Sequence, residues 1–454
     1  MGVTFLVAAL AGGLVAGGAW AGPVERSERP ILRGGAAETV SRSSYAPIAP
    51  GQSLRPTARV RAAVLAPGSA PEAADQPSGS DAGLLAWIET FTPRARAQGI
   101  GAETLRRAFA DVRYDADVIR RDRNQSEFTK TLWDYLASAV SDSRIDNGRA
   151  ALREHDTLLR EIEARYGVPK EIVTAIWGLE SAYGTFRGSN PVIGSMATLA
   201  YDGRRAAFFE EQLIAALQIL QEGHTTPENM TGSWAGAMGH TQFMPTSFRQ
   251  LAVDWTGDGR RDIWGDDPAD ALASTAHYLA ENGWVTGQPW GVEVRLPAGF
   301  DYGQASRDIK RLPSDWARDG VVGTDGQPVR DHGQASVLVP AGHRGVAFLV
   351  FDNFRVIERY NAADAYVIGV GHLADRLAGG TPFRAGWPEG DRALTRDERM
   401  ELQRRLSAVG FDTRGVDGRI GPITLSAVRA FQRSRGMVPD GYADPALLER
   451  LRDL

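Results

Sequence analysis

Apolar residues recur at helical spacing through most of the chain between Gly83 and Asn282, and this pattern constrains the fold more than any other feature. It is typical of helices that turn one face toward a core. The segments are 84–91, 128–136, 158–166, 208–222 and 269–282. Residues 290–351 instead contain polar–apolar alternation and short apolar runs, which predict strands. Helical spacing returns over 362–377. We therefore expect an α+β domain that is mainly helical and has a small β insertion.

One further predicted helix places a glutamate among apolar and aromatic neighbours. Pro169 favours the start of this helix, and Gly184 favours its end. Glu180 then lies in the last turn, where the helix dipole disfavours a negative charge. Nearby Ile176 and Trp177 desolvate the carboxyl, which also favours its protonated form. A neutral carboxylic acid is what a glycosidic oxygen requires from a general acid. A solvated glutamate at a helix end has the same local pattern, so this assignment needs a second motif.

That second motif begins at Gly236 with the sequence Gly-Ala-Met-Gly-His-Thr-Gln-Phe-Met-Pro-Thr-Ser, and Ala-Val-Asp and a Gly-Asp-Gly loop follow it. Together with Glu-Ser-Ala-Tyr-Gly at Glu180, it resembles the membrane-bound lytic transglycosylase B family over residues 81–385. The resemblance implies a lysozyme-like fold and cleavage of peptidoglycan glycan strands. It also implies that Glu180 is the sole catalytic acid and base. The next acidic residues downstream, Asp202, Glu210 and Glu211, stand in charged, solvent-facing sequence contexts.

The family's reaction consumes no water. By resemblance, Glu180 protonates the oxygen between N-acetylmuramic acid (MurNAc) and N-acetylglucosamine (GlcNAc). It then acts as base on the C6 hydroxyl of the same MurNAc, which closes a 1,6-anhydro ring. An attacking group within the same sugar has a high effective concentration, which can replace an enzyme nucleophile.

Several polar and aromatic residues carry over from the family as substrate-binding residues. Gln242 can donate and accept hydrogen bonds to an acetamido sugar. Tyrosine suits sugars because its ring packs on a pyranose while its hydroxyl stays paired. Core packing is the alternative role for these tyrosines. No role is assigned to His240. The expected substrate-binding residues are Tyr135, Ser233, Gln242, Tyr278, Tyr360, Asn361 and Tyr366.

A loop that begins at Asp254 has the first half of an EF-hand pattern. Oxygen ligands stand at positions 1, 3 and 5, and glycine stands at position 6. Gly265 occupies position 12, where a glutamate is expected, and the resemblance implies closure by a later aspartate. A metal-free turn is the alternative. We expect a structural Ca²⁺, and no cofactor for the chemistry, with the ligands Asp254, Thr256, Asp258, the carbonyl of Arg260, and Asp270.

The last sixty residues form a separate unit after a linker over 386–391. Gly-Val-Asp-Gly-Arg-Ile-Gly-Pro-Ile-Thr at Gly415, followed by Ala-Val-Arg-Ala-Phe-Gln at Ala427, resembles the three-helix peptidoglycan-binding domain. We expect this domain over 392–454. The alternative is a helical bundle that serves another partner.

Composition limits the remaining possibilities. The 454 residues carry a formal net charge of −5, which does not suggest a nucleic-acid partner. The absence of cysteine excludes disulfides, thiol catalysis and a lipid-modified cysteine, so we expect no lipoprotein. Uncharged residues 3–20 end at Ala-Trp-Ala, which predicts a signal peptide over 1–21 and a periplasmic location. A transmembrane anchor is the alternative. Residues 22–80 are rich in Pro, Ala, Ser and Gly and predict a disordered tether.

Three functions therefore stay open on the residues alone. The first is an exported lytic transglycosylase, and the second is a lysozyme-like muramidase that admits water. The third is a non-catalytic cell-wall-binding scaffold. We expect a monomer that binds peptidoglycan strands.

Overall fold

The computed structural model describes residues 79–123 and 130–454. The predicted signal peptide, nearly all of the predicted tether, and Phe128 lie outside these described residues. None of the helices in the described ranges is long and apolar enough to cross a bilayer.

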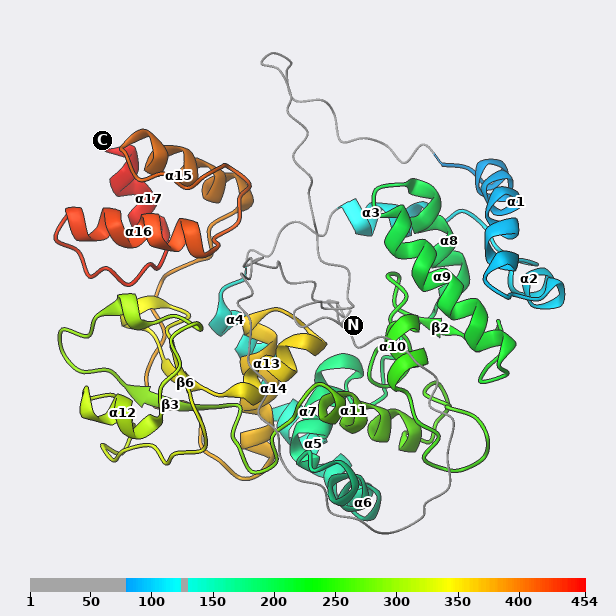
Figure 1. Cartoon of the computed structure of the whole chain (residues 1–454), viewed down its shortest axis with the longest axis horizontal. Helices are drawn as coiled ribbons and strands as arrows, with labels where there is room; N and C mark the ends of the chain where they lie inside the picture. Colours follow the sequence, from blue (N-terminus) through cyan, green and yellow to red (C-terminus); the bar gives the residue numbers. More distant parts are fainter. Residues whose placement is uncertain (1–78, 124–129) are drawn as a thin grey trace, which may run out of the picture.

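The first large core is helical and extends from α1 to α14. Figure 1 shows α1 to α3 beside α8 and α9 at one side of the molecule, with α5 to α7 and α11 below them. The helices of this region are α1 (Asp81–Ala97), α2 (Ala102–Ala108), α3 (Ala116–Arg123), α4 (Leu132–Ala139), α5 (Asp142–Glu154), α6 (Asp156–Tyr166), α7 (Lys170–Ser181), α8 (Val192–Asp202), α9 (Ala206–Gln221), α10 (Pro245–Leu251), α11 (Ala269–Glu281), α13 (Asp352–Tyr360) and α14 (Asp364–Leu377).

Helix α1 illustrates how apolar residues at helical spacing pack into the core. Leu84, Ile88 and Phe91 are buried, as their spacing predicts, while Leu85 is 49% exposed. Ser80 caps this helix, because its hydroxyl accepts a hydrogen bond from the N–H of Gly83 at 3.1 Å. The spacing therefore identified the helix and most of its buried face, but not the exposure of Leu85.

The predicted β insertion is a four-stranded antiparallel sheet in the order β4-β3-β6-β5. It has its own small core, which includes the fully buried Trp316. Its parts are β3 (Gly291–Arg295), η1 (Tyr302–Gln304), α12 (Pro313–Arg318), β4 (Val322–Gly323), β5 (Ser336–Leu338), η2 (Gly342–Arg344) and β6 (Ala347–Val350). A second, two-stranded sheet pairs β1 (Asn190–Pro191) with β2 (Thr231–Gly232). The fold is thus mainly helical with small sheets, as expected.

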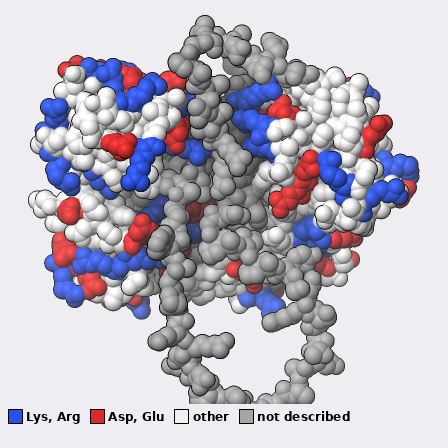
Figure 2. All heavy atoms as spheres, turned by 45° about the horizontal axis from the view of Figure 1, so that its top comes forward, with Lys and Arg blue, Asp and Glu red and all other residues white. Residues whose placement is uncertain are grey.

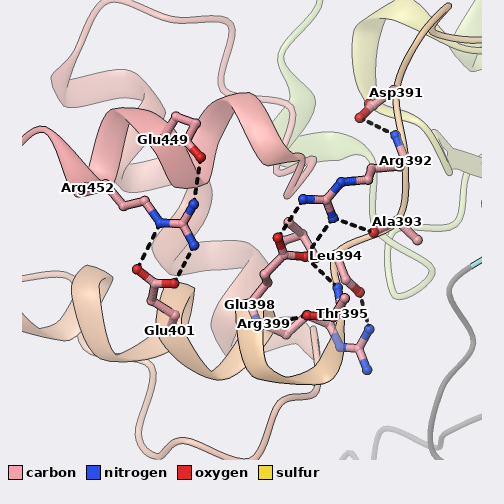
Figure 3. A network of polar contacts seen from close by, with 10 residues as sticks. All are labelled: Asp391, Arg392, Ala393, Leu394, Thr395, Glu398, Arg399, Glu401, Glu449 and Arg452. Atoms are coloured by element: carbon pink, nitrogen blue, oxygen red, sulfur yellow. Dashed lines mark hydrogen bonds and ion pairs between the residues drawn. The ribbon is translucent and has the colours of Figure 1, made fainter.

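The C-terminal unit has a third, separate core around Phe431. It consists of α15 (Arg396–Ala408), α16 (Pro422–Ser434) and α17 (Pro445–Arg452). Figure 3 shows two ion clusters that hold it together. Arg452 joins Glu401 of α15 to Glu449 of α17, with the nearest atoms 2.6 Å apart in both pairs. Hydrogen bonds from Arg392 lower the pKa of Glu398 to about 2.

The segment before this unit packs on the larger domain. Trp387 stacks on Trp133 of α4, with ring centroids 5.9 Å apart. The carboxylate of Glu293 accepts a hydrogen bond from the N–H of Ala385 at 2.8 Å. In Figure 1 the C-terminal helices lie next to the β3–β6 sheet, across the molecule from α1 and α2. The linker predicted over 386–391 is therefore fixed to the domain that it follows.

Candidate active site

A cavity of about 570 Å³ opens beside the end of α7. Its walls come from α3, α4, α7, α14, the β1–β2 sheet and the segments around them. Glu180 is the only carboxylate among the described residues that line it. The lining residues are Arg121, Tyr135, Leu179, Glu180, Thr185, Phe186, Arg187, Gly188, Ser189, Asn190, Thr231, Ser233, Trp234, Ala237, Gln242, Trp264, Asn361 and Tyr366.

Glu180 lies in the last turn of α7, as predicted, and only 8% of it is exposed. The hydroxyl of Tyr366, on α14, donates a hydrogen bond to Glu180 Oε1 at 2.7 Å. Leu179 beside it belongs to the apolar wall of the cavity. The carboxyl is thus held in a largely desolvated place, with one tyrosine fixing its orientation.

The helix ends three residues before the predicted stop. Ala182 has φ 49° and Tyr183 has φ 59°, so two residues with side chains adopt the left-handed conformation before Gly184. The hydroxyl of Tyr183 donates to the carbonyl of Arg144 at 2.8 Å and fixes this turn. Such strained positions concentrate at functional sites. The turn redirects the chain so that Phe186 and the residues after it line the cavity.

His240, to which the sequence assigned no role, anchors the end of α7. The indole of Trp177 donates to His240 Nδ1 at 3.1 Å, so the proton of the neutral ring lies on Nε2. Nε2 then donates to the carbonyl of Gly265 at 2.8 Å. Ser181 donates a hydrogen bond to the carbonyl of His240. Burial lowers the pKa of His240, and the positive charge of Arg187 lowers it further. A neutral histidine therefore joins the Glu180 helix to the loop at Gly265.

Gln242 lines the cavity in a left-handed conformation, with φ 55°. Its amide nitrogen donates to the carbonyls of Arg187 and Gly239, both at 2.9 Å. Gly239 is required here, because a Cβ atom on it would lie 2.2 Å from the carbonyl oxygen of Ile263. Gln242 therefore lies on the cavity wall with its amide nitrogen held by two main-chain carbonyls, and its role in substrate binding stays a prediction.

Tyr278 and Tyr360 do not line the large cavity but line a smaller pocket with Gln242, so their role in substrate binding stays a prediction. The hydroxyl of Tyr360 donates to the carbonyl of Thr241, next to Gln242. Tyr278 donates to the carbonyl of Arg359 at 2.8 Å. Their rings pack on each other with centroids 4.9 Å apart. Both tyrosines therefore lie behind the wall that carries Gln242 and support it by packing.

The other predicted binding residues do line the cavity. Tyr135 comes from α4 and Tyr366 from α14, on the side where Glu180 is held. Ser233 follows β2, and its hydroxyl accepts a hydrogen bond from the N–H of Ala237 at 3.0 Å. Asn361 is 2% exposed and accepts from the N–H of Ala363 at 3.2 Å. The cavity thus brings together predicted residues as far apart in the sequence as Tyr135 and Tyr366.

Sequence reasoning missed Arg121, Phe186, Arg187 and Trp234 on the cavity wall. Arg187 bonds the carbonyl of Trp264 at 2.9 Å and pairs with Asp266 at 3.0 Å. Phe186 is 45% exposed, which is unusual for a large apolar residue. The sequence signal that could have identified Phe186 as a wall residue is its position six residues after Glu180.

In the Asp254 loop, two of the predicted calcium ligands, Asp254 and Asp270, accept hydrogen bonds from the backbone of the loop. The carboxylate of Asp254 accepts hydrogen bonds from the N–H groups of Gly257 and Gly259 at 2.7 and 2.8 Å. Buried Asp270 accepts three, from Trp255, Thr256 and Asp262 at 2.8 to 3.1 Å. Within the described ranges no three His, Asp or Glu side chains converge as a metal cluster. Asp254 and Asp270 thus hold the loop through its backbone, and calcium binding stays a prediction.

Comparison with known families matches nearly all of the described chain to two domains. Residues 83–375 match the transglycosylase SLT domain, and residues 395–451 match the peptidoglycan binding domain. Membrane-bound lytic murein transglycosylase B of Escherichia coli (strain K12) is 34% identical over 251 residues. That alignment covers 54% of this chain and 66% of the relative, slightly less than two thirds of its length.

Solved structures give the same assignment. SltB3 from Pseudomonas aeruginosa, in complex with NAG-anhNAM-pentapeptide, is 52% identical with a TM-score of 0.80, over 81% of this chain and 99% of that one. The same protein has also been solved in complex with NAG-NAM-pentapeptide. The Escherichia coli lytic transglycosylase Slt35, in complex with calcium, is 30% identical with a TM-score of 0.56, over 66% of this chain and 93% of that one.

Proposed function

This chain belongs to the transglycosylase SLT family of lytic murein transglycosylases, and we propose that Glu180 is the single general acid and base with which it cleaves peptidoglycan strands. The observation that carries this proposal is the composition of the cavity. Most glycosidases need two carboxylates, about 5–9.5 Å apart, that flank the bond. Glu180 is the only carboxylate among the described residues that line this cavity. A reaction that needs one carboxyl group therefore fits these lining residues better than a hydrolysis that needs two.

In the proposed reaction, protonated Glu180 gives its proton to the glycosidic oxygen between MurNAc and GlcNAc. The carboxylate that results takes a proton from the C6 hydroxyl of the same MurNAc. That hydroxyl oxygen bonds to the anomeric carbon as the GlcNAc oxygen departs, and a 1,6-anhydro ring closes. Tyr366 keeps the carboxyl oriented through both steps. Gln242 is held rigidly enough to position the sugar.

The test is mass spectrometry of muropeptides released from purified peptidoglycan. We expect the protein to release products with 1,6-anhydro ends, lighter than hydrolysis products by one water. Glu180→Gln should lower the rate at least about 10³-fold, because no other carboxyl replaces the proton donor. Glu171→Gln, in the first turn of the same helix, is the matched control and should keep the activity. Products with reducing ends would instead make the protein a muramidase.

We also propose that the Asp254 loop binds a structural Ca²⁺ ion. Asp254, Thr256, Asp258, the carbonyl of Arg260, and Asp270 would supply the oxygen ligands. Two observations support the proposal: the loop backbone is already folded around Asp254, and the relative Slt35 has been solved with calcium. Oxygen ligands are those that Ca²⁺ prefers, and the ion would stabilise the loop without entering the chemistry.

Calcium should raise the melting temperature of the protein, and Asp254→Asn should remove this rise. Asp325→Asn is the control, because Asp325 also accepts a backbone N–H, from Gln327 at 2.9 Å, but lies in the β insertion. An equal melting temperature with and without calcium in the unaltered protein would contradict the proposal.

We propose, finally, that the protein works as a periplasmic monomer with a catalytic domain over 81–385 and a peptidoglycan-binding domain over 392–454. The family matches support both domains, and peptidoglycan as substrate supports the location. Sedimentation of the purified chain and fractionation of cells test the monomer and the periplasmic location.

A further inference from the structure

The end of α7 is held by buried polar contacts, and several of them meet at His240. On the face that Figure 2 shows, basic and acidic side chains lie close together at the surface. Exposed ion pairs of that kind contribute little to stability, because water and salt screen them. His240 is different, because only 3% of it is exposed. It contacts Trp177, Ser181 and Gly184, which lie on both sides of Glu180 in the sequence.

The ring of His240 explains why the motif at Glu180 ends in glycine. A Cβ atom on Gly184 would lie 2.6 Å from Cε1 and Nδ1 of the ring, and the backbone there has φ +83°. A side chain at Gly184 would therefore be both crowded and strained. The hydroxyl of Ser181 accepts a hydrogen bond from the N–H of Gly184 at 2.9 Å and donates one to the main-chain carbonyl of His240. Two residues of the motif thus fit against His240.

The opposite side of His240 contacts the cavity wall. Its Nε2 donates to the carbonyl of Gly265 at 2.8 Å, and its main-chain N–H donates to the carbonyl of Ile263 at 3.0 Å. Trp264, between these two residues, lines the cavity. Nη1 of Arg187 lies 3.2 Å from Nε2, but it donates its hydrogen bonds to the carbonyls of Trp264 and Gly265. Arg187 therefore holds the same segment of the wall without using the ring.

One form of the ring satisfies both sides. The indole of Trp177 donates to Nδ1 at 3.1 Å, so Nδ1 carries no proton, and the carbonyl of Gly265 requires the proton on Nε2. In the other tautomer and in the protonated ring, the N–H on Nδ1 would face the N–H of Trp177. A buried donor that lacks an acceptor is costly. The ring is therefore a rigid connection between α7 and the wall.

We propose that His240 is a positioning residue of the reaction, which holds the end of α7 at a fixed distance from the cavity wall at Trp264. This inference rests on the proposed function. A strand that lies against this wall then meets Glu180 within reach of its glycosidic oxygen. Tyr366 orients the carboxyl group, whereas His240 positions the helix end that carries it. Displacement of a catalytic group by about 1 Å can lower the rate about 100-fold.

The experiment measures kcat and KM on soluble glycan fragments for the full chain and four variants. His240→Phe keeps a ring but loses both of its hydrogen bonds. In His240→Asn the amide oxygen replaces only Nδ1, and in His240→Gln the amide nitrogen replaces only Nε2. His155→Gln is the matched control. His155 also packs on Trp177, with ring centroids 5.5 Å apart, but it is not among the residues that line the cavity.

We expect His240→Phe to lower kcat about 100-fold and to change KM by less than about threefold. KM should change little because Arg187 holds the carbonyls of Trp264 and Gly265 without the ring. The two amide variants each keep one contact and should lose about tenfold in kcat, and His155→Gln should keep the kcat of the unaltered protein. An unaltered kcat in His240→Phe would overturn the proposal, and so would a rise in KM alone.

Two further measurements separate positioning from support of the fold. In Glu180→Gln protein, the Kd for the same fragment should stay within about threefold when His240→Phe is added. A loss of affinity as large as the loss in kcat would mean that His240 only supports the fold. The ¹⁵N chemical shifts of the His240 ring should show the proton on Nε2, and a proton on Nδ1 would contradict the proposed connection.

These tests do not depend on the identity of the products. The comparison of kcat values holds even if the unaltered enzyme releases reducing ends, which would overturn the proposed function alone. The amide variants keep the test valid if His240→Phe does not fold, because each of them retains one of the two buried hydrogen bonds. Full kcat in both amide variants would then refute the role of His240.

Discussion

At the scale of single residues, the proposed chemistry depends on how one carboxyl group is held. Glu180 comes from α7, whereas the hydroxyl that orients it comes from Tyr366 on α14. The main-chain carbonyl of His240 adds a second contact, to Ser181 beside Glu180. The position of the acid is therefore set by side chains that are distant in sequence.

Tyr366→Phe removes only the hydroxyl that contacts Glu180. We expect kcat to fall about 10- to 100-fold, since a misoriented acid loses part of its catalytic advantage. The melting temperature should change little. Tyr302→Phe, a buried tyrosine of the β insertion, is the control and should keep full activity. Muropeptide release under saturating substrate measures the effect, and an unaltered kcat in Tyr366→Phe would contradict it.

His372 on α14 predicts a pH dependence of stability. It stacks on Phe383 with centroids 3.8 Å apart, and burial, with a smaller contribution from Arg376, lowers its pKa to about 4. The unfolded chain protonates this ring below about pH 6.5, while the folded chain keeps it neutral until about pH 4. The stabilisation is therefore present at neutral pH and is lost as pH falls through this window.

The expected contribution of His372 is a loss of about 2 kcal/mol in the free energy of unfolding between about pH 7 and pH 5. Urea unfolding at the two pH values measures it. His372→Gln should reduce the difference between them, and His332→Gln, another histidine of the described chain, should leave it as it is. Parallel pH profiles for unaltered protein and His372→Gln would show that the ring is not the source.

The predictable part of the site is the part that local motifs define. Glu180 and Gln242 stand in motifs, Ser233 and Tyr366 lie within a few residues of one, and the structure brings all four to one cavity. Local sequence does not distinguish tyrosines that line the large cavity from those that do not, because Tyr278 and Tyr135 both lie on helices with apolar neighbours. That distinction depends on contacts between distant segments, which no local pattern contains.

At the scale of elements, the helices with the most regular spacing of apolar residues were predicted best. Helices α1, α9, α11 and α14 agree with their patterns to within a few residues. No segment was predicted for α2, α3, α5, α8, α10, α12 or α13. Five of these have only six to nine residues, which carry little periodicity, and α13 follows strand β6 almost without a turn. The end of α7 was placed too late, because glycine is a strong stop signal and the chain here uses Ala182.

The left-handed cap of α7 gives a prediction with an internal control. Ala182→Gly should raise the free energy of unfolding by about 0.5–1 kcal/mol, because glycine adopts φ 49° without the clash of a Cβ atom. Ala378 caps α14 in a right-handed conformation, with φ −73°. Ala378→Gly should therefore lower the free energy of unfolding by a similar amount, because glycine increases the conformational entropy of the unfolded chain. Denaturant unfolding of both variants measures the effects, and a common sign would refute the argument.

At the scale of the whole molecule, the C-terminal domain is docked on the β insertion. The ring of His343 bonds Asp440 at 2.6 Å, and Arg344 pairs with Asp444 at 2.7 Å. Burial by itself would raise the pKa of Asp440, but the hydrogen bonds, including those from His343, outweigh it and lower the pKa. Asp440 therefore stays ionised, and the contact persists at neutral pH.

The double variant His343→Ala, Arg344→Ala should release the C-terminal domain. We expect the radius of gyration in small-angle X-ray scattering to increase by a few ångströms, with both domains still folded. Arg318→Ala, an exposed arginine of α12 that pairs within its own helix, is the control. An unchanged scattering curve would mean that the packed linker, with Trp387 on Trp133, holds the domain by itself.

The solitary carboxyl in the cavity has a consequence for the proton inventory of the enzyme. In the proposed cycle the proton that leaves Glu180 with the GlcNAc oxygen is replaced by the one from the C6 hydroxyl. The group therefore ends each turnover in its starting protonation state, and no exchange with bulk solvent is needed before the next one. Product release, not reprotonation, then resets the enzyme, so its turnover does not depend on proton exchange with bulk water.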